Sequence, residues 1–286
     1  MSDKITQFTR DGLLFDVADS GPQSPTASEL PVILLHGFPE RASCWTGVTA
    51  LLNEHGLRTV APDQRGYSRG ARPRPIRAYR MDELVDDVIA LADALDAPRF
   101  HLVGHDWGAS VAYLVAARHP DRVATLTTLA VPHPAAFLRA MPHGQAIKSW
   151  YMAFFQLPGL PERALTYLAR SGGGPGGRFE SYPGYSERLS REIVDDGALT
   201  GGLNWYRAMR YQSVRSLADE IVRVPTTYVY GDKDSFLGKA GARGCAAFVD
   251  APYEFIVAEG VDHWMPERVP ELVADAVVAR VESQPS

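Results

Sequence analysis

The chain lacks several features that would assign a protein to a broad class at once. It has only two cysteines, Cys44 and Cys245, and they do not have the spacing of metal ligands. We interpret both as small hydrophobes in a reducing cytoplasm, so a cytoplasmic location is expected. No apolar run is long enough to cross a bilayer, and residues 1–6 begin no run of signal-peptide length. The sequence therefore predicts no membrane partner.

An excess of basic charge is also absent. The 29 basic and 34 acidic residues are interspersed and give a formal net charge of −5, which argues against a nucleic-acid partner. No internal repeat is visible. With 286 residues, 45% of them hydrophobic, the chain can bury a large core as one domain or as a domain with an insertion.

What the chain does have is a strand-to-helix turn with a glycine two residues on each side of its centre. An apolar run ends at Gly104 and a run of small residues begins at Gly108. This spacing is typical of a nucleophile elbow, a turn too sharp for either position to carry a side chain easily. The central residue, Asp106, would face the N–H groups and positive dipole end of the new helix. An ordinary turn with a capping aspartate is the alternative.

An aspartate at this position suits one kind of chemistry. A carboxylate that attacks an sp3 carbon forms an ester, and water can hydrolyse the carbonyl of that ester. A serine attacking the same carbon would form an ether that water cannot cleave. Asp106 therefore favours alkyl transfer from a carbon–oxygen or carbon–halogen bond over acyl transfer.

The rest of the chain alternates strands and helices, which predicts an α/β fold with a parallel sheet covered on both faces. After residue 134 this alternation stops, and residues 135–216 are helix-like and rich in aromatics. We predict a core of residues 1–134 and 217–286 with a helical cap, 135–216, inserted in it. Residues 20–28 and the glycine run 171–177 are expected to be surface loops. The expected strands are a hairpin in 5–17, then 31–35, 57–62, 100–104, 123–131, 224–230 and 253–258, and the expected helices are 81–95, 109–118 and 270–281.

The elbow and the segment 36–40, His-Gly-Phe-Pro-Glu, together resemble the α/β-hydrolase fold. The resemblance is to its branch of epoxide hydrolases and haloalkane or haloacid dehalogenases. It implies a cis Phe38–Pro39 bond and an oxyanion site made by the N–H groups of Phe38 and Trp107. It also implies that Pro39 and Trp107 contact substrate, that His36 is structural, and that the loop 63–67 is scaffold.

Two further residues complete a candidate triad with Asp106. Asp234 and His263 each follow the end of a predicted strand, where ligands bind in open α/β sheets. The order nucleophile, acid, base is that of the α/β hydrolases. By resemblance, the last aspartate of Gly-x-x-Asp orients the histidine, which favours Asp234 over Asp232. Asp262 departs from the family pattern, and it either raises the pKa of His263 or faces water.

The cap distinguishes the two chemistries of that branch. Residues 150–159 and 203–207 resemble the tyrosine segments of epoxide hydrolases, which implies that Tyr151 and Tyr206 donate hydrogen bonds to the epoxide oxygen. Fluoroacetate dehalogenases have a His-Trp pair where this chain has Met152 and Ala153. A packing role for either tyrosine stays open, since the chain has twelve of them.

The predicted function is hydrolysis of an epoxide to a vicinal diol through an ester on Asp106. Asp234 and His263 then serve hydrolysis of the ester, and Tyr151 and Tyr206 serve ring opening. The reaction needs a small apolar epoxide and water, and neither cofactor nor metal. The alternatives are a dehalogenase with the same triad and a non-catalytic receptor for small ligands. The sequence leaves open the epoxide, its stereochemistry, the pathway and the oligomeric state, a homodimer included.

Overall fold

A computed structural model describes residues 4–22, 30–172, 182–213 and 220–283. The predicted loop at 20–28 and the glycine run at 171–177 lie mostly outside these residues. Within them, no helix has both the length and the apolar character needed to cross a membrane.

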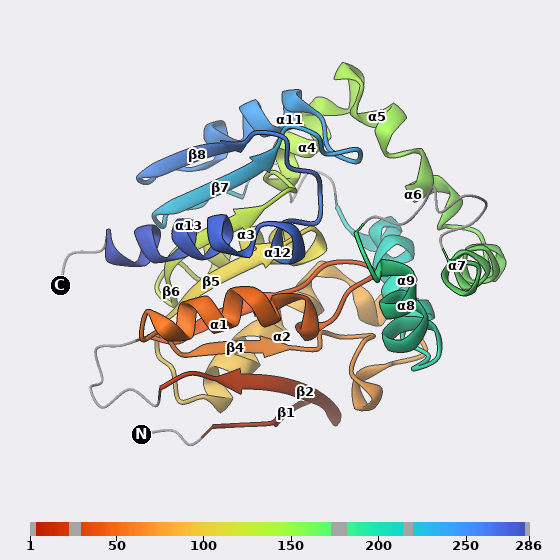
Figure 1. The fold of residues 1–286 in the computed structure, drawn as a ribbon, viewed down its shortest axis with the longest axis horizontal. Coiled ribbons are helices and arrows are strands. Elements are labelled where there is room, and N and C mark those ends of the chain that lie inside the picture. Colours follow the sequence, from red (N-terminus) through yellow and green to blue (C-terminus); the bar gives the residue numbers. More distant parts are fainter. Residues whose placement is uncertain (1–3, 23–29, 173–181, 214–219, 284–286) are drawn as a thin grey trace.

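The core is an eight-stranded sheet, and its strands follow the order β1-β2-β4-β3-β5-β6-β7-β8 (Figure 1). The first three of these pair antiparallel, while β4 and all the strands after it pair parallel. This arrangement confirms the predicted fold class. The strands are β1 Gln7–Arg10, β2 Leu13–Ser20, β3 Val32–Leu35, β4 Thr59–Pro62, β5 Phe100–His105, β6 Val123–Leu129, β7 Thr226–Gly231 and β8 Tyr253–Ala258.

Helices cover both faces of the sheet, and β3 shows why. All four of its residues are buried, and Val32 and Leu34 belong to one hydrophobic core while Ile33 and Leu35 belong to the other. Helices α1 Thr46–Glu54 and α13 Pro270–Glu282 pack together in front of the sheet in Figure 1, and α2 Met81–Ala94 and α3 Trp107–Arg118 pack together behind it.

One strand ends earlier than its apolar run predicts. The sequence favours a strand over 123–131, but β6 stops at Leu129 because Ala130 has a positive φ of 64°. The chain turns there toward the cap.

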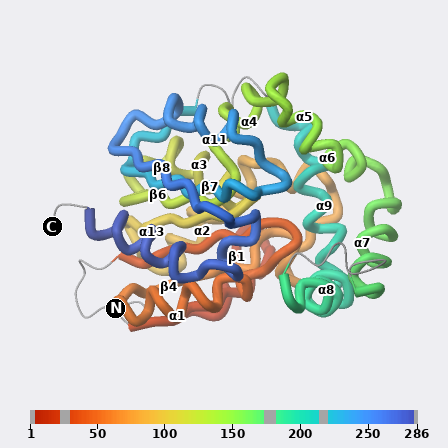
Figure 2. The backbone as a smooth tube through the Cα atoms, turned by 45° about the horizontal axis from the view of Figure 1, so that its top comes forward, coloured from red at the N-terminus to blue at the C-terminus, as the bar shows by residue number. Residues whose placement is uncertain are grey.

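The helices between β6 and β7 lie mainly at the carboxyl ends of the parallel strands (Figures 1 and 2). The exception is α4, which packs against α11 Lys239–Gly244 of the core. The division into core and cap stays a prediction. These helices are α4 Pro134–Ala140, α5 Gln145–Lys148, α6 Trp150–Phe154, α7 Leu160–Arg170, α8 Tyr185–Arg188 and α9 Leu199–Ala208.

Helix α9 is fixed to the core through the loop 63–67. The backbones of Gly66 and Gly201 touch so closely that a Cβ on Gly201 would lie 2.2 Å from the Gly66 oxygen. The Trp205 indole also donates a hydrogen bond to the Arg65 carbonyl at 2.8 Å. This loop therefore sets the position of α9 and of Tyr206 on it.

Candidate active site

The turn between β5 and α3 has the geometry that its glycines predict. Asp106 occupies it with φ 51° and ψ −119°, a strained conformation for a residue with a side chain. A Cβ on Gly104 would lie 2.4 Å from the Gly108 oxygen, and a Cβ on Gly108 would lie 2.2 Å from the Leu35 oxygen. No side chain fits at either position, so the turn stays sharp and Asp106 projects from it.

The loop after β3 meets the Asp106 side chain directly. The Phe38–Pro39 peptide bond is cis, and the Phe38 N–H donates to Asp106 Oδ1 at 2.9 Å. The Trp107 N–H is the first of helix α3 and has no acceptor within the helix. The predicted oxyanion donor Phe38 therefore contacts the carboxyl group, while the role of the Trp107 N–H stays a prediction.

His36 has the structural role that the resemblance implies. Its Nε2 accepts the Gln64 N–H at 3.1 Å, so its Nδ1 carries the proton and donates to the Gly37 carbonyl at 2.9 Å. Burial lowers the pKa of His36 to about 4, so the ring is neutral. It joins the ends of β3 and β4 beneath the site.

His263 lies between two carboxyl groups. Its Nδ1 donates to Asp234 Oδ2 at 2.8 Å, and its Nε2 lies 3.5 Å from Asp106 Oδ2. Asp106, Asp234 and His263 are 8%, 4% and 4% exposed, so bulk water screens these contacts little. The structure thus brings together the three residues of the predicted triad at the ends of β5, β7 and β8.

This arrangement controls the charges of His263 and Asp106. Burial disfavours a charged His263, but the nearby Asp234 and Asp106 raise its pKa well above the usual value. Burial also disfavours ionised Asp106, but the hydrogen bond and charge of His263 and the Phe38 N–H lower its pKa below the usual value. Both shifts favour an ionised Asp106 beside a protonated His263.

The two other aspartates near His263 make different contacts. Asp232 turns toward the end of β8, where its Oδ1 accepts the Gly260 N–H at 2.7 Å. Asp262 accepts the Trp264 N–H at 3.2 Å and forms an ion pair with Arg268, also at 3.2 Å. Of the three aspartates, Asp234 contacts the imidazole of His263, in keeping with its predicted role.

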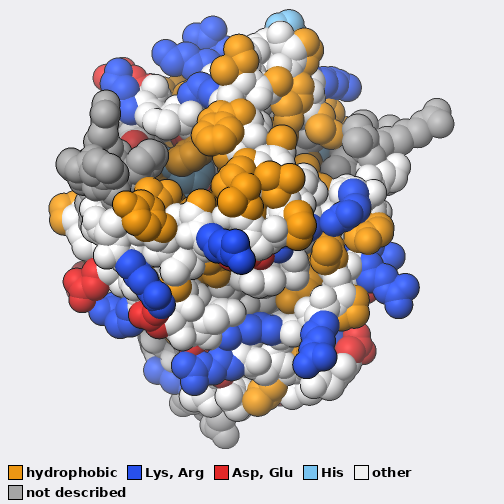
Figure 3. Space-filling view, turned by 90° about the vertical axis from the view of Figure 1, so that its right-hand side faces the viewer, with side chains coloured by type: hydrophobic (Ala, Val, Ile, Leu, Met, Phe, Trp, Pro, Cys, Tyr) orange, Lys and Arg blue, Asp and Glu red, His pale blue; other side chains and the backbone are white. Residues whose placement is uncertain are grey.

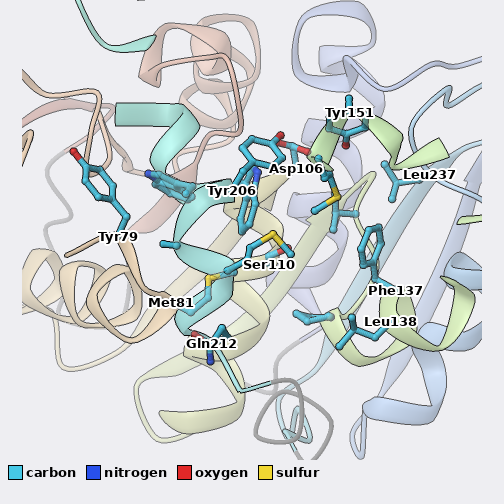
Figure 4. A pocket seen from close by; sticks show the side chains of 17 residues that line it. Tyr79, Met81, Asp106, Ser110, Phe137, Leu138, Tyr151, Tyr206, Gln212 and Leu237 are labelled. Carbon is cyan, nitrogen blue, oxygen red and sulfur yellow. The ribbon is translucent and has the colours of Figure 1, made fainter. Parts of the chain in front are cut away.

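Helices α6 and α9 bring Tyr151 and Tyr206 to the site. Their ring centroids are 6.1 Å apart, and in the view of Figure 4 Asp106 lies between them. Burial is the main cause that raises the pKa of both hydroxyls above the usual value. Both phenols therefore stay protonated and able to donate at neutral pH.

A cavity opens above Asp106 and is lined almost entirely by apolar side chains (Figure 4). Among the described residues that line it, Asp106 is the one charged group. Pro39, a predicted substrate contact, lines a separate crevice with Glu40 and Tyr182. The cavity residues are Tyr79, Met81, Asp106, Trp107, Ser110, Val131, Pro134, Phe137, Leu138, Tyr151, Met152, Trp205, Tyr206, Ala208, Met209, Gln212 and Leu237.

The outside of the cap is apolar as well. Figure 3 shows hydrophobic side chains gathered on the face that contains the cap helices. Ile147 is 79% exposed and Trp150 is 68% exposed. Part of the surface of α5 and α6 is therefore apolar.

Sequence reasoning missed the polar residues that lie behind the histidine. His105 is fully buried, and its Nε2 lies 2.9 Å from the His263 carbonyl oxygen. Glu40 contacts the other nitrogen of His105, and Glu267 contacts Glu40. A polar residue at the end of a buried strand, directly before the nucleophile, was the signal that could have pointed to His105.

Comparison with known proteins places the chain in a class. Residues 31–267 match the family described as alpha/beta hydrolase fold. The chain therefore belongs to the α/β-hydrolase family, as its sheet and nucleophile elbow indicate.

The similar proteins narrow the class. The chain is 32% identical to Epoxide hydrolase A of Mycobacterium tuberculosis, with 93% of this chain and 94% of that protein covered. It is 33% identical to Epoxide hydrolase 3 of Xenopus tropicalis, with 85% and 70% covered. The crystal structure of Epoxide Hydrolase A from Mycobacterium thermoresistibile has a TM-score of 0.80, with 27% identity and 97% of each chain covered. The chain is a member of the epoxide-hydrolase-like branch.

Proposed function

We propose that this chain is an epoxide hydrolase that opens small apolar epoxides to vicinal diols through an ester on Asp106. One observation carries the proposal: the Asp106 carboxylate, paired with His263, meets two tyrosine side chains in an otherwise apolar cavity. An epoxide needs a nucleophile on carbon and donors on oxygen, and this cavity presents both. The names of the similar proteins support the same reaction.

Ring opening uses the groups that face the cavity. An Asp106 oxygen attacks an epoxide carbon and forms the ester while the carbon–oxygen bond of the ring breaks. Tyr151 and Tyr206 hydrogen-bond to the ring oxygen, and one of them gives it a proton, so that it becomes a hydroxyl. Donors that strengthen as charge develops on oxygen lower the barrier most.

Hydrolysis of the ester uses the groups behind Asp106. His263 takes a proton from water, whose oxygen adds to the ester carbonyl, and the Phe38 and Trp107 N–H groups bind the resulting oxyanion. The intermediate collapses as His263 returns the proton to the leaving oxygen, which completes the diol. The regenerated Asp106 acid passes its proton to His263, and the tyrosinate regains one from solvent.

Esterification also prepares the base. While Asp106 is ionised, its charge raises the pKa of His263. The ester is neutral, so that contribution disappears when the intermediate forms and the pKa of His263 falls. His263 can then release its proton to solvent, at the stage that requires a base.

The remaining predictions concern the surroundings of the enzyme. The expected reactants are a small apolar epoxide and water, and no step above calls for a metal or a cofactor. The cap of residues 135–216, a substrate contact at Pro39, a cytoplasmic location and the option of a homodimer stay predictions.

A trapping experiment tests the function. His263→Gln should open styrene oxide but leave the ester in place, which adds the mass of one substrate to the peptide that contains Asp106. Asp106→Ala, the control, should show no adduct. In a single turnover of wild-type enzyme in 18O water, the heavy oxygen should enter the Asp106 carboxylate before it enters the diol.

The alternatives give other results. Heavy oxygen in the first diol with none in the protein would refute the covalent route. A dehalogenase would form the adduct with halogenated substrates only, and a receptor would form none.

A further inference from the structure

A second cluster of buried titratable groups lies behind His263, and the proposed mechanism does not use it. Glu40 follows the cis-Pro39 bond, and Glu267 is on the short helix α12 Met265–Arg268. The Glu40 residue is 4% exposed and the Glu267 side chain is 9% exposed. Two carboxyl groups so deeply buried need partners, and their partners lead to the catalytic base in one direction and to the cap in the other.

The direction toward the base runs through His105. Its Nε2 lies 2.9 Å from the His263 carbonyl oxygen, which can only accept, so this nitrogen carries a proton. Its Nδ1 lies 3.1 Å from Glu40 Oε2, so a second proton lies between His105 and Glu40. Burial lowers the pKa of His105, which favours the neutral ring with that proton on Glu40.

The direction toward the cap runs through Glu267. Tyr182 donates its hydroxyl to Glu267 Oε1 at 3.1 Å, and Arg188 donates to the same oxygen at 3.3 Å. Both donors come from residues 135–216. They occupy one oxygen of Glu267 and leave the other facing inward.

The inward oxygens require a proton. Glu40 Oε1 and Glu267 Oε2 are buried, and neither has a hydrogen-bond donor when both groups are ionised. The two carboxyl groups nevertheless adjoin, with one oxygen of each within 4.8 Å of the other. A proton on Glu267 supplies the donor and gives both oxygens a partner. This holds whether the second proton is on Glu40 or on His105.

We propose that Glu267 works as a neutral carboxylic acid, a positioning residue that holds the His263 backbone through Glu40 and His105 and links it to the cap. The proposal rests on the proposed function, because the base it positions is the one that hydrolyses the Asp106 ester. Tyr182 and Arg188 donate to the outer oxygen of Glu267. One series of hydrogen bonds therefore connects the position of the cap helices to the orientation of His263.

The chain of hydrogen bonds has a pH limit. Burial and the adjacent Glu40 raise the pKa of Glu267 to about 10. Below that pH the proton is present, and above it the pair keeps one proton for two acceptors. Either the contact between Glu267 and Glu40 or the contact between Glu40 and His105 then lacks its proton. A new negative charge also lies near His263. The groups that face Glu267 from every packed element are Glu40, Cys44, His105, Tyr182 and Arg188.

A metal ion is the other occupant to consider. Glu40, Cys44 and Glu267 each place one ligand atom within 4.8 Å of the others. Burial raises the pKa of the Cys44 thiol well above its usual value, and the Arg188 guanidinium already binds Glu267. Both effects oppose a cation, so a proton fits the site better.

Infrared spectroscopy of the enzyme without substrate tests the proton directly. At pH 8 the wild type should show the carbonyl stretch of a buried neutral acid, and the band should fade as the pH passes about 10. Glu267→Gln should lose the part of the band that fades near pH 10 and keep any band that comes from a neutral Glu40. Glu192→Gln is the matched control, because Glu192 contacts Arg188 at 3.7 Å but is not part of the acid pair, and this variant should keep the band.

Single-turnover kinetics test the positioning. Hydrolysis of the ester should slow above about pH 10 in the wild type and in Glu192→Gln. Glu267→Gln has a donor that does not titrate, so this decline should disappear. Glu267→Met has no donor and should slow hydrolysis by about tenfold at pH 8, the scale of one lost hydrogen bond, while ring opening continues.

Three results would overturn the proposal: an acid band that still fades near pH 10 in Glu267→Gln, a Glu267→Met variant with the wild-type rate and pH profile, or a bound divalent metal that Glu267→Gln loses. The infrared band needs no turnover. If the band behaves as expected but no epoxide is opened, the proposed function fails and the acid pair stands.

Discussion

Replacing Asp234 by asparagine should stop the reaction at the ester, and the structure shows why. Asp234 Oδ1 accepts two backbone N–H groups, from Phe236 at 2.7 Å and from Leu237 at 2.8 Å. In Asp234→Asn the amide oxygen must take that place, because an amide nitrogen there would face two donors. The amide nitrogen is then directed at His263 Nδ1, at the place where Asp234 Oδ2 accepts at 2.8 Å.

That orientation changes which ring nitrogen of His263 carries the proton. A donor at Nδ1 forces this nitrogen to accept, so the proton moves to Nε2, which lies 3.5 Å from Asp106. A protonated Nε2 cannot take a proton from water. The wrong tautomer in a triad of this kind lowers the rate about 10⁴-fold, or about 5.5 kcal/mol of transition-state stabilisation.

Rapid-quench single turnovers with styrene oxide measure the two steps apart. Asp234→Asn should form the alkyl-enzyme and hydrolyse it about 10⁴-fold more slowly than the wild type. Asp232→Asn is the matched control, because Asp232 accepts the Gly260 N–H and does not touch the imidazole. A larger loss in Asp232→Asn, or hydrolysis within tenfold of the wild type in Asp234→Asn, would refute the assignment.

Three other substitutions test the helices that carry the two tyrosines. Tyr151→Phe and Tyr206→Phe each remove one donor to the ring oxygen, so each should slow formation of the alkyl-enzyme by about 10²–10³-fold. The double variant should nearly stop this step. An unchanged rate in the double variant would show that both tyrosines are packing residues. Gly201→Ala would place a Cβ 2.2 Å from the Gly66 oxygen, displace α9 and cost about 1–3 kcal/mol of unfolding free energy, measured by denaturant titration.

Much of the core could be predicted because its signals are local. A run such as Val32 to Leu35, buried on both faces, reads as a central parallel strand without any knowledge of its neighbours. The two glycines around Asp106 define a turn by steric exclusion alone. Because parallel strands end at the same edge of a sheet, Asp234 and His263 could also be placed near Asp106 from their positions in the chain.

The cap was predicted only as a helical region, without its separate helices. Its helices are short, and left-handed glycines precede them at positions that a periodic pattern does not mark, such as Gly144, Gly159 and Gly184. The cap tyrosines came from a resemblance, since one tyrosine in a run of aromatics looks like any other. Their shared cavity with Asp106 depends on how α9 packs on the loop at Gly66, which is a tertiary contact.

Glu267 shows why the remaining part of the site could not be predicted. In sequence it is an acid in the first turn of a helix, which usually faces water and favours the helix dipole. In the fold it lies against a second acid and under the cap, so its chemistry is decided by residues distant in the chain. Asp106 is equally buried, yet an N–H donor and a histidine keep its pKa low, whereas Glu40 beside Glu267 keeps that pKa high. The partners of a buried acid, rather than its burial, decide whether it serves as a nucleophile or as a donor.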